Sequence, residues 1–139
     1  MKKIKKAFLA VIVGCMLLST TALAATNSFE FTFTDLLNYT YYESWQKVND
    51  SQAYTITLDR YNGIFKNTMS SDNIFGCRMK DMSIGPVVDN YHTYSNYVTD
   101  YAQAYIYTVN RGDTMKLGAK KDSASISSKD LKISGSIVP

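Results

Sequence analysis

Residues 29–34 read Phe-Glu-Phe-Thr-Phe-Thr, so that an aromatic ring alternates with a polar side chain at every step. Because successive side chains of a β-strand point to opposite faces, this pattern gathers the three rings on one buried face. The stretch 54–58, Tyr-Thr-Ile-Thr-Leu, repeats the alternation, and Asn62-Gly63 then supplies a turn. The chain is therefore expected to bury its core between β-strands.

Residues 100–109 are the strongest candidate for a central strand, because alanine and isoleucine line one face and tyrosine lines the other. The remaining candidate strands are 39–46, 74–80, 87–88, 114–119, 123–127 and 131–137. About eight short strands, each with one apolar face, predict an all-β chain. We expect a single-domain antiparallel β-sandwich, jelly-roll-like, over residues 29–139.

Two stretches, 35–48 and 89–101, are compatible with either helix or strand. Apolar residues recur at helical spacing between Leu37 and Val48, and tyrosines do so between Tyr91 and Tyr105. Tyrosine and threonine nevertheless favour strands. We expect a strand at 39–46 and a loop or strand, rather than a helix, at 89–101.

The first 24 residues have the three parts of an export signal. Four lysines precede an apolar run from Ala7 to Leu18, and Ala22-Leu23-Ala24 fits a signal-peptidase site. Twelve apolar residues are too few to span a bilayer, which takes roughly 20. We expect cleavage between Ala24 and Ala25, a flexible new N-terminus at 25–28, and a secreted protein.

A membrane-anchored lipoprotein is the alternative. Ile12-Val13-Gly14-Cys15 resembles a lipobox, in which the cysteine is acylated. The apolar residues after Cys15 and the downstream Ala-Leu-Ala motif favour the secreted form. Membrane contact is expected only through the leader, or through acylated Cys15.

Cleavage changes the charge of the chain. Removing four lysines turns a net charge of +3 into −1. The remaining basic residues are dispersed along the sequence, so no nucleic-acid partner is expected. Cys77 becomes the lone cysteine and cannot form an intramolecular disulfide. We expect it to be a small buried residue, with a disulfide-linked dimer or a reactive thiol as alternatives.

Catalytic patterns are missing from the sequence. His92 is the only histidine, which rules out a standard zinc site and leaves any nucleophile with a single conventional base. No phosphate-binding glycine loop occurs. We expect no catalytic residues, metal or cofactor, and a protein that is not an enzyme. A small glycan hydrolase built on paired carboxylates is the least favoured alternative.

The positive signal is aromatic, since the chain contains eleven tyrosines and one tryptophan. Such side chains offer a flat apolar ring with a polar tip, which suits sugars and protein partners. The candidate ligand-binding residues fall into two clusters: Tyr41, Tyr42, Trp45 and Tyr91, Tyr94, Tyr97. A non-enzymatic binding module for cell-wall glycan or a surface protein is the leading hypothesis.

The leader, the Ala22-Leu23-Ala24 site and the tail 133–139 give the chain a general layout. This layout resembles small secreted proteins of low-GC Gram-positive bacteria, including the lactococcin-type bacteriocins. The resemblance implies a signal peptide followed by a compact β-sandwich. It makes a secreted antibacterial protein the second functional hypothesis, and it carries over no functional residue.

Overall fold

The structure, a computed structural model, describes residues 25–34, 39–64 and 66–139. Within these ranges it contains nine strands and no helix, hence none that is long and apolar enough to cross a membrane. The predicted leader and Cys15 lie outside the described residues. The strands are β1 (Asn27–Phe33), β2 (Thr40–Tyr41), β3 (Trp45–Gln46), β4 (Ala53–Leu58), β5 (Phe75–Asp81), β6 (His92–Tyr94), β7 (Tyr101–Ala104), β8 (Thr114–Lys121) and β9 (Leu131–Val138).

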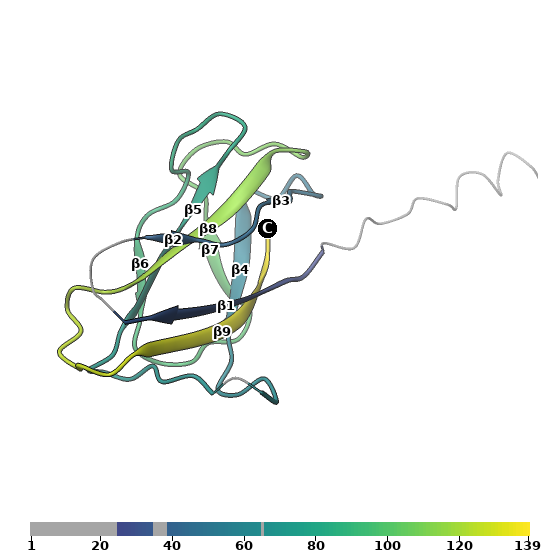
Figure 1. The fold of residues 1–139 in the computed structure, drawn as a ribbon. Coiled ribbons are helices and arrows are strands. Elements are labelled where there is room, and N and C mark those ends of the chain that lie inside the picture. Colours follow the sequence, from purple (N-terminus) through teal and green to yellow (C-terminus); the bar gives the residue numbers. More distant parts are fainter. Residues whose placement is uncertain (1–24, 35–38, 65) are drawn as a thin grey trace, which may run out of the picture.

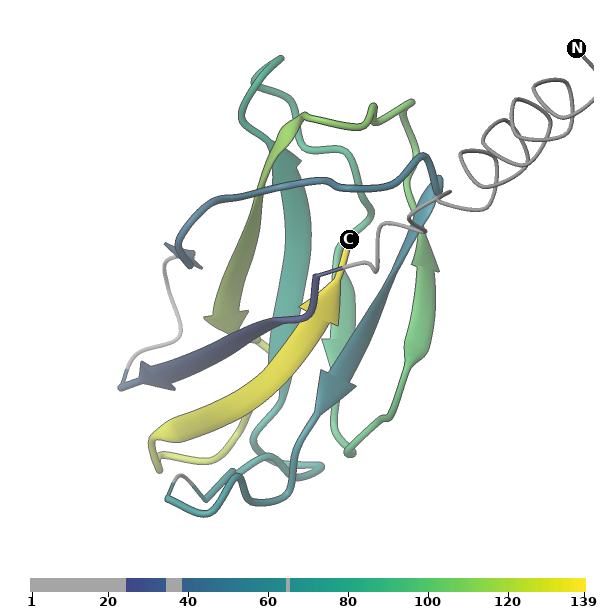
Figure 2. The same ribbon diagram turned by 90° about the vertical axis from the view of Figure 1, so that its right-hand side faces the viewer.

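These strands form two antiparallel sheets. The first sheet has the order β1-β9-β4-β7, and the second has β2-β8-β5-β6, with β3 also pairing with β8. β1 and β9 lie side by side although they come from opposite ends of the described chain (Figures 1 and 2). If β2 and β3 count as one interrupted strand, this is the eight-strand order of a jelly roll. The predicted single-domain sandwich is confirmed.

The core lies between the two sheets. Phe29, Phe31 and Phe33 are all buried, as the alternation of 29–34 predicts. Phe29 of β1 stacks on Phe75 of β5 with ring centroids 6.4 Å apart, and so joins one sheet to the other. β1 begins at Asn27, inside the segment 25–28 that we expected to be flexible, and Asn27 pairs with Ile137.

The prediction of a central strand at 100–109 is wrong. Only Tyr101–Ala104 form a strand, β7, and it lies at the edge of the first sheet. After it, the backbone N–H of Tyr105 still donates to Gln52 beside β4, but that of Ile106 donates to Val88, so the chain leaves the ladder at Ile106. Apolar residues occupy both faces of this stretch in the sequence because its two parts lie in different surroundings. The first part lies along the open edge of the first sheet, and the second part crosses between the two sheets.

Residues 123–127 form a turn and loop rather than the predicted edge strand. Asp122 organises this turn: its carboxylate accepts from the N–H of Ala124, and its carbonyl accepts from the N–H of Ser125. The strand predicted at 39–46 is present in two pieces, β2 and β3. In the stretch 89–101, His92–Tyr94 are a strand and no helix forms, as expected.

Candidate functional site

Three tyrosine rings lie together on the outer face of the second sheet, and we call Tyr39, Tyr41 and Tyr91 the tyrosine face. The Tyr39 ring stacks against the Tyr41 ring with centroids 6.2 Å apart, and meets the Tyr91 ring edge-on at 6.1 Å. Tyr41 and Tyr91 remain 39% and 38% exposed. The rings therefore form one continuous aromatic surface that solvent reaches.

Two glycines make room for two of these rings on the sheet. Tyr41 pairs with Gly118 of β8, and a Cβ at Gly118 would sit 2.6 Å from the Tyr41 ring. A Cβ at Gly76 of β5 would collide with the Tyr91 hydroxyl. Because neither glycine has a side chain, the rings of Tyr41 and Tyr91 can approach the backbone of the sheet closely.

The hydroxyls of Tyr39 and Tyr91 stay protonated at neutral pH. Burial raises the pKa of Tyr91 far above its ordinary value, and its hydrogen bond to the Asp122 carboxylate raises it further. Burial also raises the pKa of Tyr39, against the opposing effect of the neighbouring Arg78. The Tyr91 hydroxyl is thus engaged within the protein, and Tyr39 and Tyr91 contribute uncharged rings to the face.

Four cationic side chains surround the rings: Arg78 and Lys80 of β5, and Lys116 and Lys120 of β8. The Arg78 guanidinium lies 4.0 Å from the Tyr39 ring centroid, and the Lys120 ammonium lies 5.1 Å from Tyr39 and 4.9 Å from Tyr91. Across the described ranges, the one ion pair joins Asp89 to His92, so none of these four cations is paired.

The first predicted aromatic cluster divides between the two sides of the second sheet. Tyr41 lies on the outer face, whereas the Tyr42 ring turns inward and packs edge-on against Phe31 at 5.8 Å. Trp45 pairs with Met115, an inward residue, because one extra residue between β2 and β3 shifts the alternation. Its ring packs against the core, and its indole Nε1 is buried without a hydrogen-bond partner.

The second predicted cluster also separates. Tyr91 belongs to the tyrosine face, Tyr94 points inward from β6, and the Tyr97 ring packs under the Arg60 guanidinium at 5.0 Å. Of the six candidates, the structure therefore brings together only Tyr41 and Tyr91, through Tyr39.

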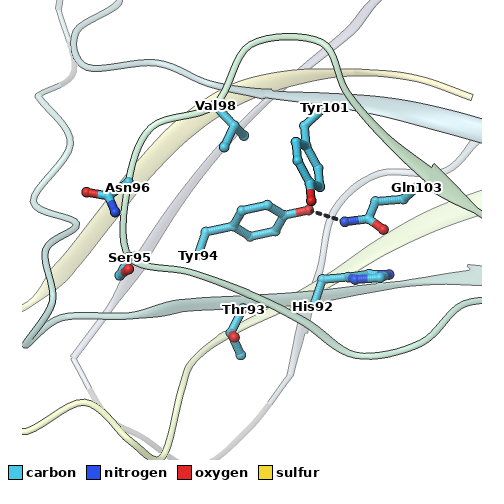
Figure 3. Close-up of a pocket in the computed structure, with 8 residues that line it drawn as sticks. All are labelled: His92, Thr93, Tyr94, Ser95, Asn96, Val98, Tyr101 and Gln103. Atoms are coloured by element: carbon cyan, nitrogen blue, oxygen red, sulfur yellow. Dashed lines mark hydrogen bonds between the residues drawn. The ribbon is translucent and has the colours of Figure 1, made fainter.

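Tyr94 lines a pocket of about 340 Å³ at the open edge where β6 approaches β7 (Figure 3). The Gln103 amide donates a 3.1 Å hydrogen bond to the Tyr94 hydroxyl, and the Tyr94 and Tyr101 rings meet at right angles. The pocket residues are His92, Thr93, Tyr94, Ser95, Asn96, Val98, Tyr101 and Gln103. Their side chains are mostly polar.

Behind this pocket lies a buried carboxylate. Asp89 accepts a hydrogen bond from the buried Tyr54 hydroxyl through one oxygen, and its other oxygen is 2.7 Å from His92 Nε2. Both carboxylate oxygens are thus engaged within the protein. These contacts link β6 to β4 across the two sheets. They give His92 a structural role as a hydrogen-bond partner of Asp89. No cluster of three metal-ligating side chains occurs in the described ranges.

Cys77 is free and fully buried, as predicted. Burial raises the pKa of its thiol well above the ordinary 9.0, and the nearby Asp89 carboxylate adds to the effect. Since the thiolate is the reactive form, native Cys77 should not react with iodoacetamide at about pH 8. Mass spectrometry should find full labelling in urea and almost none in buffer. Rapid labelling of the native protein would contradict this burial.

The cations of the site were missed in the sequence because they are far apart in the chain. The signal was present as a period of two: Arg78-x-Lys80 on one strand and Lys116-x-Gly118-x-Lys120 on another. Joining them requires the register that sets Arg78 opposite Gly118. No family model matches the chain, and no curated protein or solved structure gives a significant match to it.

Proposed function

We propose that this protein is a non-enzymatic binding module that is secreted, acts at the cell surface and holds a cell-wall glycan on the tyrosine face. The observation that carries the proposal is the continuous, solvent-accessible surface of three rings, of which Tyr41 lies over Gly118 and Tyr91 over Gly76. The export leader at 1–24 supports a role outside the cytoplasm.

The geometry of the face suits an oligosaccharide. Sugar rings have flat apolar faces edged by hydroxyls, and tyrosine offers a matching flat ring with a hydroxyl tip. From Tyr41 through Tyr39 to Tyr91 the ring centroids are 6.2 and 6.1 Å apart, so the aromatic surface extends over about two ring-to-ring steps. A surface of this length accommodates several linked sugars more readily than a single one.

Replacing Tyr41 with alanine should weaken binding to purified cell-wall glycan about fivefold, because an aromatic contact contributes about 1 kcal/mol. Pull-down on cell walls and affinity electrophoresis measure the loss. Tyr107→Ala is the matched control, since Tyr107 is 58% exposed but lies away from the tyrosine face. Equal binding by both variants and the unaltered protein would contradict the proposal. Capture of a surface protein without glycan binding would favour the other kind of partner.

Gly118→Ala provides a second variant that keeps every aromatic ring. The added Cβ forces the Tyr41 ring off the sheet. The arrangement of the three rings is therefore lost, although all three tyrosines are still present. We expect glycan binding to fall as it does in Tyr41→Ala. The melting temperature, measured in parallel, separates this loss from unfolding.

A further inference from the structure

We propose that the glycan is an anionic polymer with a phosphate or carboxylate group on its repeating unit, and that Lys80 and Lys116 hold one of these groups beside Tyr41. This inference rests on the proposed function and names the class of its ligand. The placement of positive charge on the second sheet carries it.

Lys80 and Lys116 occupy directly opposed positions on neighbouring strands. The register of β5 and β8 pairs Lys80 with Lys116, and both side chains point to the outer face. Like charges opposite each other destabilise a sheet. Neither lysine forms an ion pair with another described residue. An anion placed between the two ammonium groups would convert this repulsion into attraction.

A hollow lies where that anion would sit. Tyr41, Lys80, Met82 and Lys116 line a space of about 120 Å³ on the outer face. The Lys80 ammonium is 6.0 Å from the centroid of the Tyr41 ring. A sugar stacked on Tyr41 would therefore place an attached acidic group within reach of both lysines.

The rest of the face repeats this combination of ring and cation. Lys120 lies between the rings of Tyr39 and Tyr91, and Arg78 lies over Tyr39 with its Nε buried and without a hydrogen-bond partner. The chain beyond residue 24 carries a net charge of −1, yet this face gathers four cationic side chains, against the single Asp122 carboxylate that accepts from the Tyr91 hydroxyl. A polymer with an acidic group on each repeat complements this excess of positive charge.

The experiment compares four probes: polyglycerol phosphate, polygalacturonate, neutral dextran and a single-stranded oligonucleotide. The protein from Ala25 onward should bind one or both acidic polymers at least tenfold more tightly than dextran, with an affinity that falls as salt rises. The two acidic probes show whether phosphate or carboxylate is preferred. Equal affinity for dextran, or tighter binding to the oligonucleotide, would overturn the inference.

The double variant Lys80→Gln, Lys116→Gln should lose at least tenfold in affinity for the acidic polymer. Its melting temperature should stay level or rise, because the repulsion between the two lysines is removed. Lys132→Gln is the matched control, since Lys132 is exposed on β9 of the first sheet. If Tyr41→Ala weakens binding and the lysine double variant does not, the glycan site stands and its acidic ligand is refuted. If no polymer binds, the proposed function itself fails.

Discussion

Raising the pH from about 8 to about 12 should unfold the protein in a cooperative transition with a midpoint between about pH 11 and pH 12. Four buried groups drive this loss. Burial raises the pKa of Tyr54, Tyr94 and Tyr105 above the ordinary 10.0, and that of the Cys77 thiol above 9.0. The native state therefore keeps these four groups protonated in alkaline solution.

The direction of the effect follows from proton binding. Above their ordinary pKa values, these groups release protons in the unfolded chain but hold them in the fold, so stability falls as pH rises. The four groups contribute fully to the free energy of unfolding below about pH 9, and their contribution is lost progressively as the pH rises above it. Each group weakens the fold by about 1.4 kcal/mol per pH unit, which makes about 4 kcal/mol per unit for the three tyrosines above pH 10. The free energy of unfolding of a typical domain is only about 5–15 kcal/mol, so a few pH units are enough to unfold it.

Circular dichroism and the absorbance of ionised tyrosine, followed together, test this result. Tyrosine ionisation of the buried groups should coincide with the loss of β-structure. Tyr105→Phe is the informative variant, because the Tyr105 hydroxyl is buried without a hydrogen-bond partner. It should be at least as stable near neutral pH, and its alkaline midpoint should move upward. A protein that remains folded past pH 12 would contradict the burial of these hydroxyls.

Replacing Asp89 with alanine should lower the free energy of unfolding by about 3–5 kcal/mol. The carboxylate satisfies the buried Tyr54 hydroxyl on one side and His92 on the other. Without it, Tyr54 keeps a buried donor with no acceptor, and β6 loses its link to β4. Urea denaturation measures the loss.

Asp89→Asn is the matched control for this prediction. Asparagine has the same shape and still offers one oxygen to the Tyr54 hydroxyl, so its effect should be clearly smaller. A change below about 1 kcal/mol in the alanine variant would mean that the carboxylate is not the link between the sheets.

Much of the fold was predictable because a strand with one buried face has an apolar residue at every second position. Residues 29–33 and 54–58 show this pattern, and all their apolar side chains are buried as expected. The stretch 100–109 misled because its apolar residues serve two different surroundings in succession. Its apolar composition did not mean burial, since Tyr101, Ile106 and Tyr107 remain about half exposed and only Tyr105 and Val109 are buried.

The candidate site was less accessible to sequence reasoning. Neighbours in sequence such as Tyr41 and Tyr42 face opposite ways, whereas Tyr41 and Tyr91, far apart in sequence, are joined through the Tyr39 ring. The floor of the site depends on Gly118 and Gly76, which become adjacent to these rings only through long-range pairing. The lysines looked scattered for the same reason.

The position of β9 has a consequence for synthesis. β9 lies between β1 and β4 in the first sheet, so an inner strand of that sheet is translated after all the other described strands. β1 and β4 both pair with β9, so they cannot be joined in the first sheet while β9 is still missing from the growing chain. The first sheet can therefore form only after residues 131–138 have been synthesised.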